Sequence, residues 1–266
     1  MAQTTKAPHS PCILGIVTAD MLKKGKYPDA LWRCGGVELR ADGVAPDAIA
    51  TLVSDFDDEK IRHRFAGPVI LTLRLVRDGG AWPNESAADR NAVWESLQPG
   101  TCDWVDLEIE EIDRIAPATL DALRSSGTKI LLSHHAFGPE DSKVWGDTLS
   151  SMRALGPDGV KFAVTPSAEQ VPELLEFARR VAGEFPESCV LGMGAAGMST
   201  RLIGPLLGCP FTYGFIGEGA VAPGQLPAEA MQAFFARAAT EFPGADASDA
   251  ELPDWAGALL KKVTGA

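Results

Sequence analysis

Short apolar runs alternate with longer amphipathic segments along this chain. An apolar run of roughly four to eight residues between turn signals is typical of a buried strand. Parallel strands covered on both faces have this near-continuous apolar pattern, so the runs predict a parallel sheet. The expected strands are Ile13–Val17, Gly36–Arg40, Val69–Arg74, Trp104–Ile109, Lys129–His135, Val160–Val164, Cys189–Met193 and Phe211–Ile216.

The segments between these runs carry apolar residues at helical spacing. Regular alternation without a long linker predicts one α/β domain over residues 1–266, a (β/α)8 TIM barrel with a lead of residues 1–12. About 250 residues is the usual size of such a barrel, and a doubly wound sheet is the alternative. A short tail helix is expected at about 248–262. The other expected helices are Pro46–Arg62, Ser86–Leu97, Ile112–Ser126, Asp141–Leu155, Ala168–Glu184, Ser199–Leu207 and Ala228–Phe242.

A glycine-rich segment after the seventh expected strand matches the GxGxxG pattern of dinucleotide-binding folds. It runs from Gly192 to Gly197, and Glu218 follows roughly where a ribose-binding acid is expected. A dinucleotide-binding domain needs more strand–helix units after its fingerprint than remain here. The glycines are therefore interpreted as a turn at which the backbone comes close to a ligand.

The composition disfavours several partners. With 36 acidic and 24 basic residues, the formal charge of −12 argues against nucleic acid and anionic membranes as partners. No apolar run reaches membrane-spanning length, and the first residues have no signal-peptide pattern. The five cysteines are scattered and lack a CxxC motif, which fits a reduced cytoplasm, so we expect a cytoplasmic protein.

Lys161 lies inside an expected buried strand. Burying its charge costs several kcal/mol unless the charge is paired or neutralised, and desolvation lowers the pKa of a lysine. A neutral amine is the form that attacks a carbonyl carbon to make a Schiff base. The alternative is a structural lysine that pairs with a carboxylate or reaches the strand end.

Two histidines, His134 and His135, end the preceding expected strand. Histidine is the usual acid–base group near neutral pH, but adjacent residues on a strand point to opposite faces. At most one of the pair therefore enters a site shared with Lys161. Neither histidine has a carboxylate or cysteine at zinc-ligand spacing, so no metal is expected.

Polar residues gather at the ends of most expected strands. In a (β/α)8 barrel these ends meet on one face, where active sites form, although each residue alone fits a solvated rim charge or an ion pair. The residues are Glu38, Arg40 and Asp42; Arg74 and Asp78; Asp106, Glu108 and Glu110; His135; Lys161; Ser199 to Arg201; and the loop Val221 to Gln225.

From about Val37 to Pro227, the chain resembles the type I 3-dehydroquinate dehydratase family. The resemblance rests on Glu38-x-Arg40-x-Asp42, Thr72-x-Arg74, Ser133-x-His135-x-Phe137, Lys161-x-Ala163-x-x-Pro166, Met193-Gly194 with Ser199-x-Arg201, and Ala222-Pro223-Gly224-Gln225. Each motif alone is weak, whereas their order and their placement at strand ends are jointly specific.

The resemblance implies a Schiff-base hydro-lyase of the shikimate pathway that converts 3-dehydroquinate to 3-dehydroshikimate. It implies that Lys161 forms the imine, that His135 transfers protons and that Arg201 binds the substrate carboxylate. Glu38, Arg40, Arg74 and Gln225 would hold the ring hydroxyls, and the loop ending at Gln225 would be a lid. The family needs no cofactor, its substrate is a small anion, and its precedent suggests a homodimer.

Three positions depart from the family pattern. Asp78 stands where a glutamate usually orients the histidine, Ala136 where an aspartate or asparagine follows it, and Val221 where a lid serine contacts the substrate. Two alternatives therefore stay open. One is a related Schiff-base lyase or class I aldolase for another hydroxy-keto acid, and the other is a non-catalytic barrel that binds a shikimate-type acid.

Overall fold

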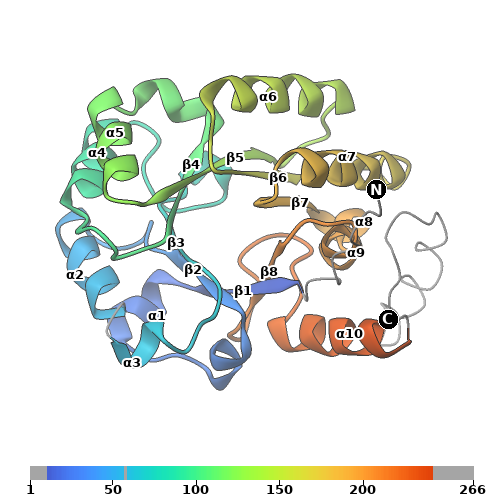
Figure 1. Ribbon diagram of the computed structural model, residues 1–266, viewed down its shortest axis with the longest axis horizontal. Helices are drawn as coiled ribbons and strands as arrows, with labels where there is room; N and C mark the ends of the chain where they lie inside the picture. Colours follow the sequence, from blue (N-terminus) through green and yellow to red (C-terminus); the bar gives the residue numbers. More distant parts are fainter. Residues whose placement is uncertain (1–10, 57–58, 242–266) are drawn as a thin grey trace, which may run out of the picture.

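The computed structural model describes residues 11–56 and 59–241. Eight parallel strands form one sheet in the order β7-β6-β5-β4-β3-β2-β1-β8, and β7 and β8 meet at the seam of a nearly closed barrel (Figure 1). The predicted (β/α)8 barrel is confirmed. The strands are β1 (Cys12–Val17), β2 (Gly36–Arg40), β3 (Val69–Thr72), β4 (Trp104–Glu108), β5 (Lys129–Ala136), β6 (Gly159–Val164), β7 (Ser188–Gly192) and β8 (Phe211–Phe215).

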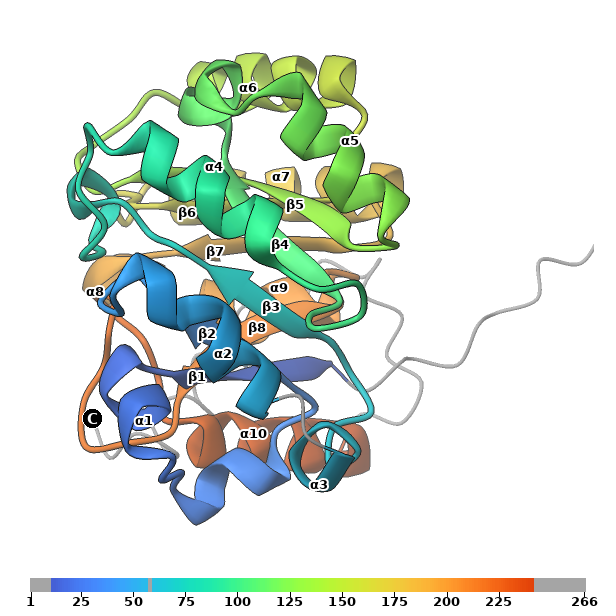
Figure 2. The same ribbon diagram turned by 90° about the vertical axis from the view of Figure 1, so that its left-hand side faces the viewer.

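Helices surround the strands on the outside of the barrel (Figure 2). The α-helices are α1 (Ala19–Lys24), α2 (Pro46–Phe56), α3 (Glu59–Arg62), α4 (Ala87–Ser96), α5 (Pro117–Ser125), α6 (Ser142–Leu155), α7 (Val171–Glu184), α8 (Gly194–Gly197), α9 (Thr200–Leu206) and α10 (Ala228–Glu241). The 3-10 helices are η1 (Asp29–Arg33), η2 (Val76–Asp78) and η3 (Ile109–Arg114).

Several boundaries differ from the prediction. The single helix expected over Ile112–Ser126 is split into η3 and α5, because Pro117 occupies the first turn of α5 and cannot continue a preceding helix. The segment Pro46–Arg62 forms two helices, α2 and α3, instead of one. Helix α1 and η1 were not predicted. The expected tail helix lies outside the described residues, so a single domain over the whole chain stays a prediction.

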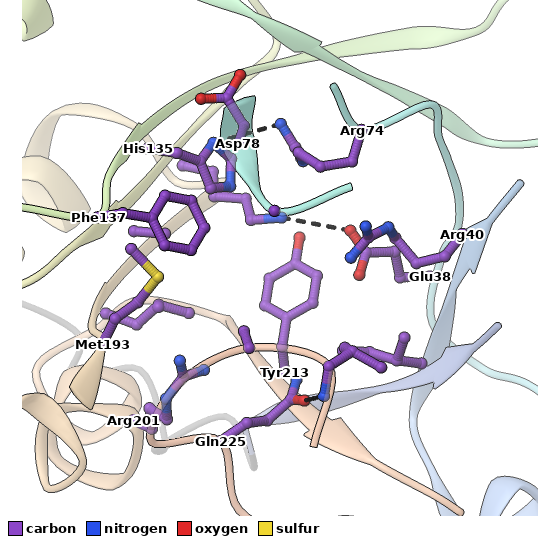
Figure 3. A pocket seen from close by; sticks show the side chains of 17 residues that line it. Glu38, Arg40, Arg74, Asp78, His135, Phe137, Met193, Arg201, Tyr213 and Gln225 are labelled. Carbon is purple, nitrogen blue, oxygen red and sulfur yellow. Dashed lines mark hydrogen bonds and ion pairs between the residues drawn. The ribbon is translucent and has the colours of Figure 1, made fainter. Parts of the chain in front are cut away.

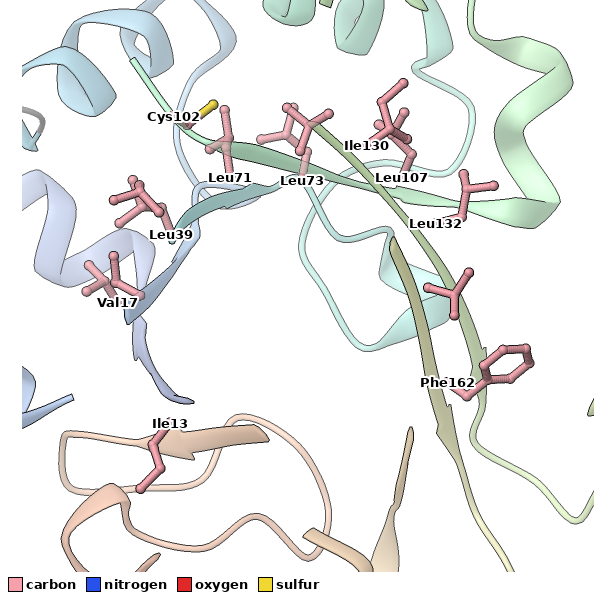
Figure 4. Close-up of a cluster of buried hydrophobic side chains, with 14 of the residues drawn as sticks. Ile13, Val17, Leu39, Leu71, Leu73, Cys102, Leu107, Ile130, Leu132 and Phe162 are labelled. Carbon is pink, nitrogen blue, oxygen red and sulfur yellow. The ribbon is translucent and has the colours of Figure 1, made fainter. Parts of the chain in front are cut away.

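Two apolar layers hold the fold together. The larger layer lies between the outer face of the strands and the helices, and Leu39, Leu71, Leu107 and Phe162 belong to it (Figure 4). A smaller layer fills the inside of the barrel. At the amino-terminal ends of the strands, the rings of Trp104 and Phe211 pack edge to face at 6.3 Å. This plug closes one end of the barrel interior and leaves the polar residues at the other end.

Strand register brings the polar residues at the carboxyl ends into contact. Ser133 on β5 lies beside Lys161 on β6, and Arg40 on β2 lies beside Thr72 on β3. Side chains of alternate residues point inward, so Trp104 at the amino-terminal end of β4 and Asp106 at its middle share the barrel interior. Over the described ranges, no helix combines the length and apolar character that crossing a membrane requires.

Candidate active site

A pocket of about 490 Å³, measured with its open mouth, lies at the carboxyl ends of the strands (Figure 3). All the residues predicted to act in catalysis or substrate binding line it. They are Glu38, Arg40, Arg74, Asp78, His135, Lys161, Arg201, Val221 and Gln225. Their meeting in one pocket is what the convergence of strand ends in a (β/α)8 barrel requires.

Lys161 is buried and ion-paired. Its Nζ atom lies 3.0 Å from Oδ2 of Asp106 and 3.3 Å from Oε1 of Glu38. The same atom lies 4.1 Å from the ring centre of Tyr213. The sequence left a paired structural lysine and a reactive pocket lysine as alternatives. In the structure Lys161 is paired, and its side chain also lines the pocket, so its reactivity stays a prediction.

A buried charge network surrounds Asp106. Arg74 contacts Asp106 at 2.7 Å and Glu108 at 3.0 Å, and Arg90 contacts Glu108 at 2.6 Å. Ser133 donates a hydrogen bond to Asp106 at 2.5 Å. Burial alone would raise the pKa of Asp106, but the charges of Arg74 and Lys161 hold it far below its usual range. Asp106 is therefore a fixed negative charge beneath the lysine.

His135 is the histidine that enters the pocket. Its Nδ1 atom lies 3.3 Å from Nη1 of Arg74. Because a guanidinium can only donate, Nδ1 accepts and a neutral His135 carries its proton on Nε2. Burial, and then the charges of Arg74 and Lys161, lower the pKa of His135 well below its ordinary value, so the ring is neutral at pH 7.

His134 points to the opposite side of β5. It hydrogen-bonds to Glu110 and, at 3.1 Å, to Glu140, and its ring packs against Phe162 in the outer layer. The strand therefore separates the two histidines as alternation requires. In the part of the chain that the structure describes, no group of three histidine, cysteine, aspartate or glutamate side chains is arranged to hold a metal ion.

Asp78 lies on η2 and lines the pocket. Among the described residues, no hydrogen bond joins it to His135. Its Oδ2 atom lies 3.5 Å from Nε of Arg77. Burial, and then the negative charge of Glu108, raise the pKa of Asp78. Arg74 contacts Nδ1 of His135 instead, and the aspartate is one methylene shorter than a glutamate.

Glu38 and Arg40 stand on the β2 side of the pocket. Thr72 donates a hydrogen bond to Glu38 at 3.0 Å. Arg40 binds Asp42 through two hydrogen bonds of 2.8 and 3.1 Å, and Asp42 also accepts one from the backbone N–H of Ala81 at 2.9 Å. Asp42 thereby holds both the arginine and the loop that carries Asp78.

Arg201 lies on α9 at the opposite side of the pocket (Figure 3). It is almost fully buried, and its Nη2 atom donates to the carbonyl of Pro223 at 3.2 Å. Its Nε atom has no acceptor among the described residues. Burial lowers the pKa of Arg201 to about 10, which leaves the side chain charged at neutral pH. A buried guanidinium with an N–H group that lacks an acceptor is suited to bind an anion.

The loop Val221 to Gln225 closes over this side of the pocket. The side-chain carbonyl of Gln225 accepts a hydrogen bond from the backbone N–H of Val221 at 3.0 Å. Gly224 has φ +70°, and a β-carbon there would collide with the backbone of Gly194. Val221 packs against the inner apolar layer and presents methyl groups to the pocket.

The glycine-rich segment Gly192 to Gly197 runs from the last residue of β7 to the end of the short helix α8. A β-carbon on Gly192 would collide with the backbone of Gly197, so both positions require glycine. Thr200 secures this turn, because its hydroxyl accepts a hydrogen bond from the N–H of Gly192 at 2.6 Å and donates one to the carbonyl of Gly197 at 2.7 Å. The segment also supports the loop Val221 to Gln225, because the backbone N–H of Gly194 donates a hydrogen bond to the carbonyl of Pro223 at 3.2 Å.

Sequence reasoning missed Tyr213, and it counted Asp106 and Glu108 among the polar strand-end residues without giving either a specific role. Tyr213 lies on β8 with its ring in the pocket wall (Figure 3). The signal was present, because Phe211 and Tyr213 alternate on a short strand and must share its inward face. Tyr213 was missed because only charged and strongly polar residues at strand ends were taken as candidates.

Comparison with known proteins places the chain in a family. The family model of type I 3-dehydroquinase matches residues 24–239. A 3-dehydroquinate dehydratase of Methanosarcina acetivorans is 31% identical over 205 residues, which cover 74% of this chain and 82% of the relative. The crystal structure of 3-dehydroquinate dehydratase from Geobacillus kaustophilus has a TM-score of 0.68 at 24% identity, covering 86% of this chain and 91% of that one. This chain therefore belongs to the type I 3-dehydroquinase family of hydro-lyases.

Proposed function

We propose that this protein dehydrates 3-dehydroquinate to 3-dehydroshikimate, a step of the shikimate pathway, through an imine on Lys161. The observation that carries the proposal is the meeting of Lys161, a neutral His135 and Arg201 in one pocket. They supply a nucleophile, a proton-transfer group and a carboxylate clamp. No cofactor is needed in this scheme, because the imine itself accepts the electron pair.

Binding of an anionic substrate depends on the local charge of the pocket, since the whole chain carries −12. Arg40, Arg74, Arg201 and Lys161 all line the pocket. The substrate carboxylate would accept hydrogen bonds from Arg201, whose Nε–H lacks an acceptor in the described structure. Glu38, Arg40, Arg74 and Gln225 would bind the ring hydroxyls, with the loop above the pocket excluding water.

The reaction proceeds through covalent catalysis. Deprotonated Nζ of Lys161 attacks the ketone carbon, and loss of the ketone oxygen as water leaves a protonated imine. His135 removes the proton from the adjacent carbon, and the electron pair moves into the imine. The pair then returns, the bond to the neighbouring ring hydroxyl breaks, and His135 gives its proton to the leaving oxygen. Hydrolysis of the imine releases the product and restores Lys161.

His135 cannot act as a base while Arg74 contacts its Nδ1 atom. Its lone pair is on Nδ1, and Arg74 covers that atom. Movement of Arg74 onto a substrate hydroxyl would free Nδ1 and allow the ring to change tautomer. Substrate binding would thus activate the base, and the catalytic role proposed for Asp78 would be to stabilise the protonated ring.

Borohydride trapping tests the proposal. The protein is mixed with 3-dehydroquinate and borohydride, and intact mass and peptide digestion locate any adduct. We expect a ligand-sized mass increase on Lys161 and its loss, together with loss of turnover, in Lys161→Ala. The surface variant Lys143→Ala serves as a control that should behave as wild type. Full turnover by Lys161→Ala would contradict the imine mechanism, and binding without turnover by wild type would favour a non-catalytic barrel.

A second candidate is a related Schiff-base lyase or class I aldolase that acts on another hydroxy-keto acid. The observation in its favour is the apolar wall made by Val221, together with the missing contact between Asp78 and His135. A trapping screen of hydroxy-keto acids distinguishes the two. An adduct that forms faster with another acid than with 3-dehydroquinate would support this candidate.

We also propose that the protein works as a cytoplasmic homodimer. Cys12, Cys34, Cys189 and Cys209 form no disulfide bond, which supports a reducing compartment. The dimer rests on family precedent. Light scattering of the purified protein measures the mass in solution, and the mass of one chain would contradict the dimer.

A further inference from the structure

Tyr213 places a buried hydroxyl in the pocket wall without a partner. Its side chain is 3% exposed, and its Oη atom has no hydrogen-bond partner among the described residues. A buried tyrosine hydroxyl usually finds a partner, and each exception in a native structure requires an explanation. Since this hydroxyl belongs to a residue that lines the pocket, a bound ligand is the natural source of the partner.

The hydroxyl lies at the nucleophile end of the pocket. Nζ of Lys161 is 4.1 Å from the centre of the Tyr213 ring. In Figure 3 the Tyr213 hydroxyl points toward Glu38, while Arg201 and Gln225 lie at the other end of the ring. A substrate whose carboxylate binds Arg201 would therefore bring its opposite end, where Lys161 attacks, to the Tyr213 hydroxyl.

The two other hydroxyl groups nearby already donate to carboxylates. The hydroxyl of Thr72 donates to Glu38, and the hydroxyl of Ser133 donates to Asp106. Burial, and then the negative charge of Glu38, raise the pKa of Tyr213 well above its ordinary value. The phenol therefore remains protonated throughout the neutral pH range and is able to donate.

We infer that Tyr213 is a further catalytic residue, whose hydroxyl donates a hydrogen bond to the substrate oxygen on the carbon that Lys161 attacks. This inference rests on the proposed imine mechanism. When the nitrogen lone pair forms the N–C bond, the π pair of the ketone moves onto oxygen, and Tyr213 stabilises that charge. The oxygen then takes the proton released by the nitrogen and the proton that the Lys161 ammonium gave up to become the neutral amine, and it leaves as water. Tyr213 keeps its own proton and acts only as a donor.

The substitution Tyr213→Phe tests the inference. It removes a hydroxyl that has no partner in the free protein, so the melting temperature should stay unchanged or rise. Rapid mixing with 3-dehydroquinate, quenching in borohydride and intact mass measure the rate of adduct formation. At saturating substrate we expect the rate constant to fall about 100-fold, the lower end of the loss reported for one oxyanion-hole donor. The substrate concentration at half saturation should change by less than about twofold.

Tyr27→Phe is the matched control, because Tyr27 is the other tyrosine of the chain and packs against Trp32 and Phe56 away from the pocket. It should trap substrate at the wild-type rate. An unchanged rate constant in Tyr213→Phe overturns the inference. A change in the substrate concentration at half saturation alone also overturns it, because the hydroxyl would then only bind substrate. Absence of an adduct even in wild type overturns the proposed function and this inference with it.

Discussion

Single residues in the pocket have their charge states set by their immediate neighbours. Arg74 contributes to two of these states, because it helps to keep Asp106 ionised and His135 neutral. Lys161 adds to both effects. The same two cations thus fix an anionic carboxylate and a neutral imidazole close to each other at neutral pH.

Val221 is the residue at which substrate preference can be tested. Replacement by serine or by isosteric threonine puts a hydroxyl on the pocket wall. We expect Val221→Ser and Val221→Thr to lower KM for 3-dehydroquinate about three- to tenfold, the effect of one added hydrogen bond. Steady-state kinetics measures the change, and Val221→Ala controls for the lost methyl groups. If the hydroxyl variants bind no better than the alanine variant, 3-dehydroquinate is not the ligand to which this wall is adapted.

Strand β5 directs its two histidines to opposite faces. His135 faces the pocket, whereas His134 joins β5 to η3 through Glu110 and to the loop before α6 through Glu140. Burial would lower the pKa of His134, but hydrogen bonds to Glu110 and Glu140 outweigh it and raise the pKa. The protonated form of His134 is therefore stabilised by folding.

This raised pKa predicts a pH-dependent contribution to stability. The contribution is fully present below the unfolded pKa of about 6.5 and is lost as pH rises through the higher folded pKa. We expect His134→Gln to lower the free energy of unfolding by about 1 kcal/mol more at pH 6 than at pH 9, a modest value because Glu110 is 42% exposed. Urea denaturation at both pH values measures it, with His63→Gln as control. Equal losses at pH 6 and pH 9 would contradict the prediction.

The whole barrel is divided between an apolar end and a polar end. Trp104 and Phe211 fill the interior at the amino-terminal ends of the strands, and the charged pocket lies at the carboxyl ends. Barrel enzymes in general keep stability and chemistry at opposite faces. Here the division follows from strand alternation, which places apolar and ionisable residues on the same inward face in succession.

Trp104→Ala tests this division. The variant leaves a cavity in the plug, and we expect it to lower the free energy of unfolding by about 3–5 kcal/mol. Because Trp104 does not line the pocket, kcat of the folded protein should remain within about twofold of wild type. Urea denaturation and steady-state kinetics on the folded fraction measure the two effects. A large loss of kcat without a loss of stability would show that the plug and the pocket are coupled.

The order of elements and the chemistry of the strand ends were readable from the sequence, because both depend on local patterns. The spacing of hydrophobic residues distinguishes strands from helices. In a (β/α)8 barrel, the position of a residue along its strand decides at which end of the barrel it lies. Element boundaries were less readable. The break before Pro117 and the 3-10 helix η3 depend on a few residues whose preferences the helical period of the surrounding segment obscured.

Which side chains touch was decided only by the tertiary structure. Lys161 pairs with Asp106, 55 residues away in the chain, and Arg74 contacts His135, 61 residues away. Such contacts depend on strand register and on the curvature of the closed barrel, which no local pattern records. The sequence by itself determined the residues available to the site and the end of the barrel they occupy. Packing in three dimensions decided that the lysine is paired, that Arg74 rather than Asp78 contacts His135, and that the Tyr213 ring lies beside Lys161.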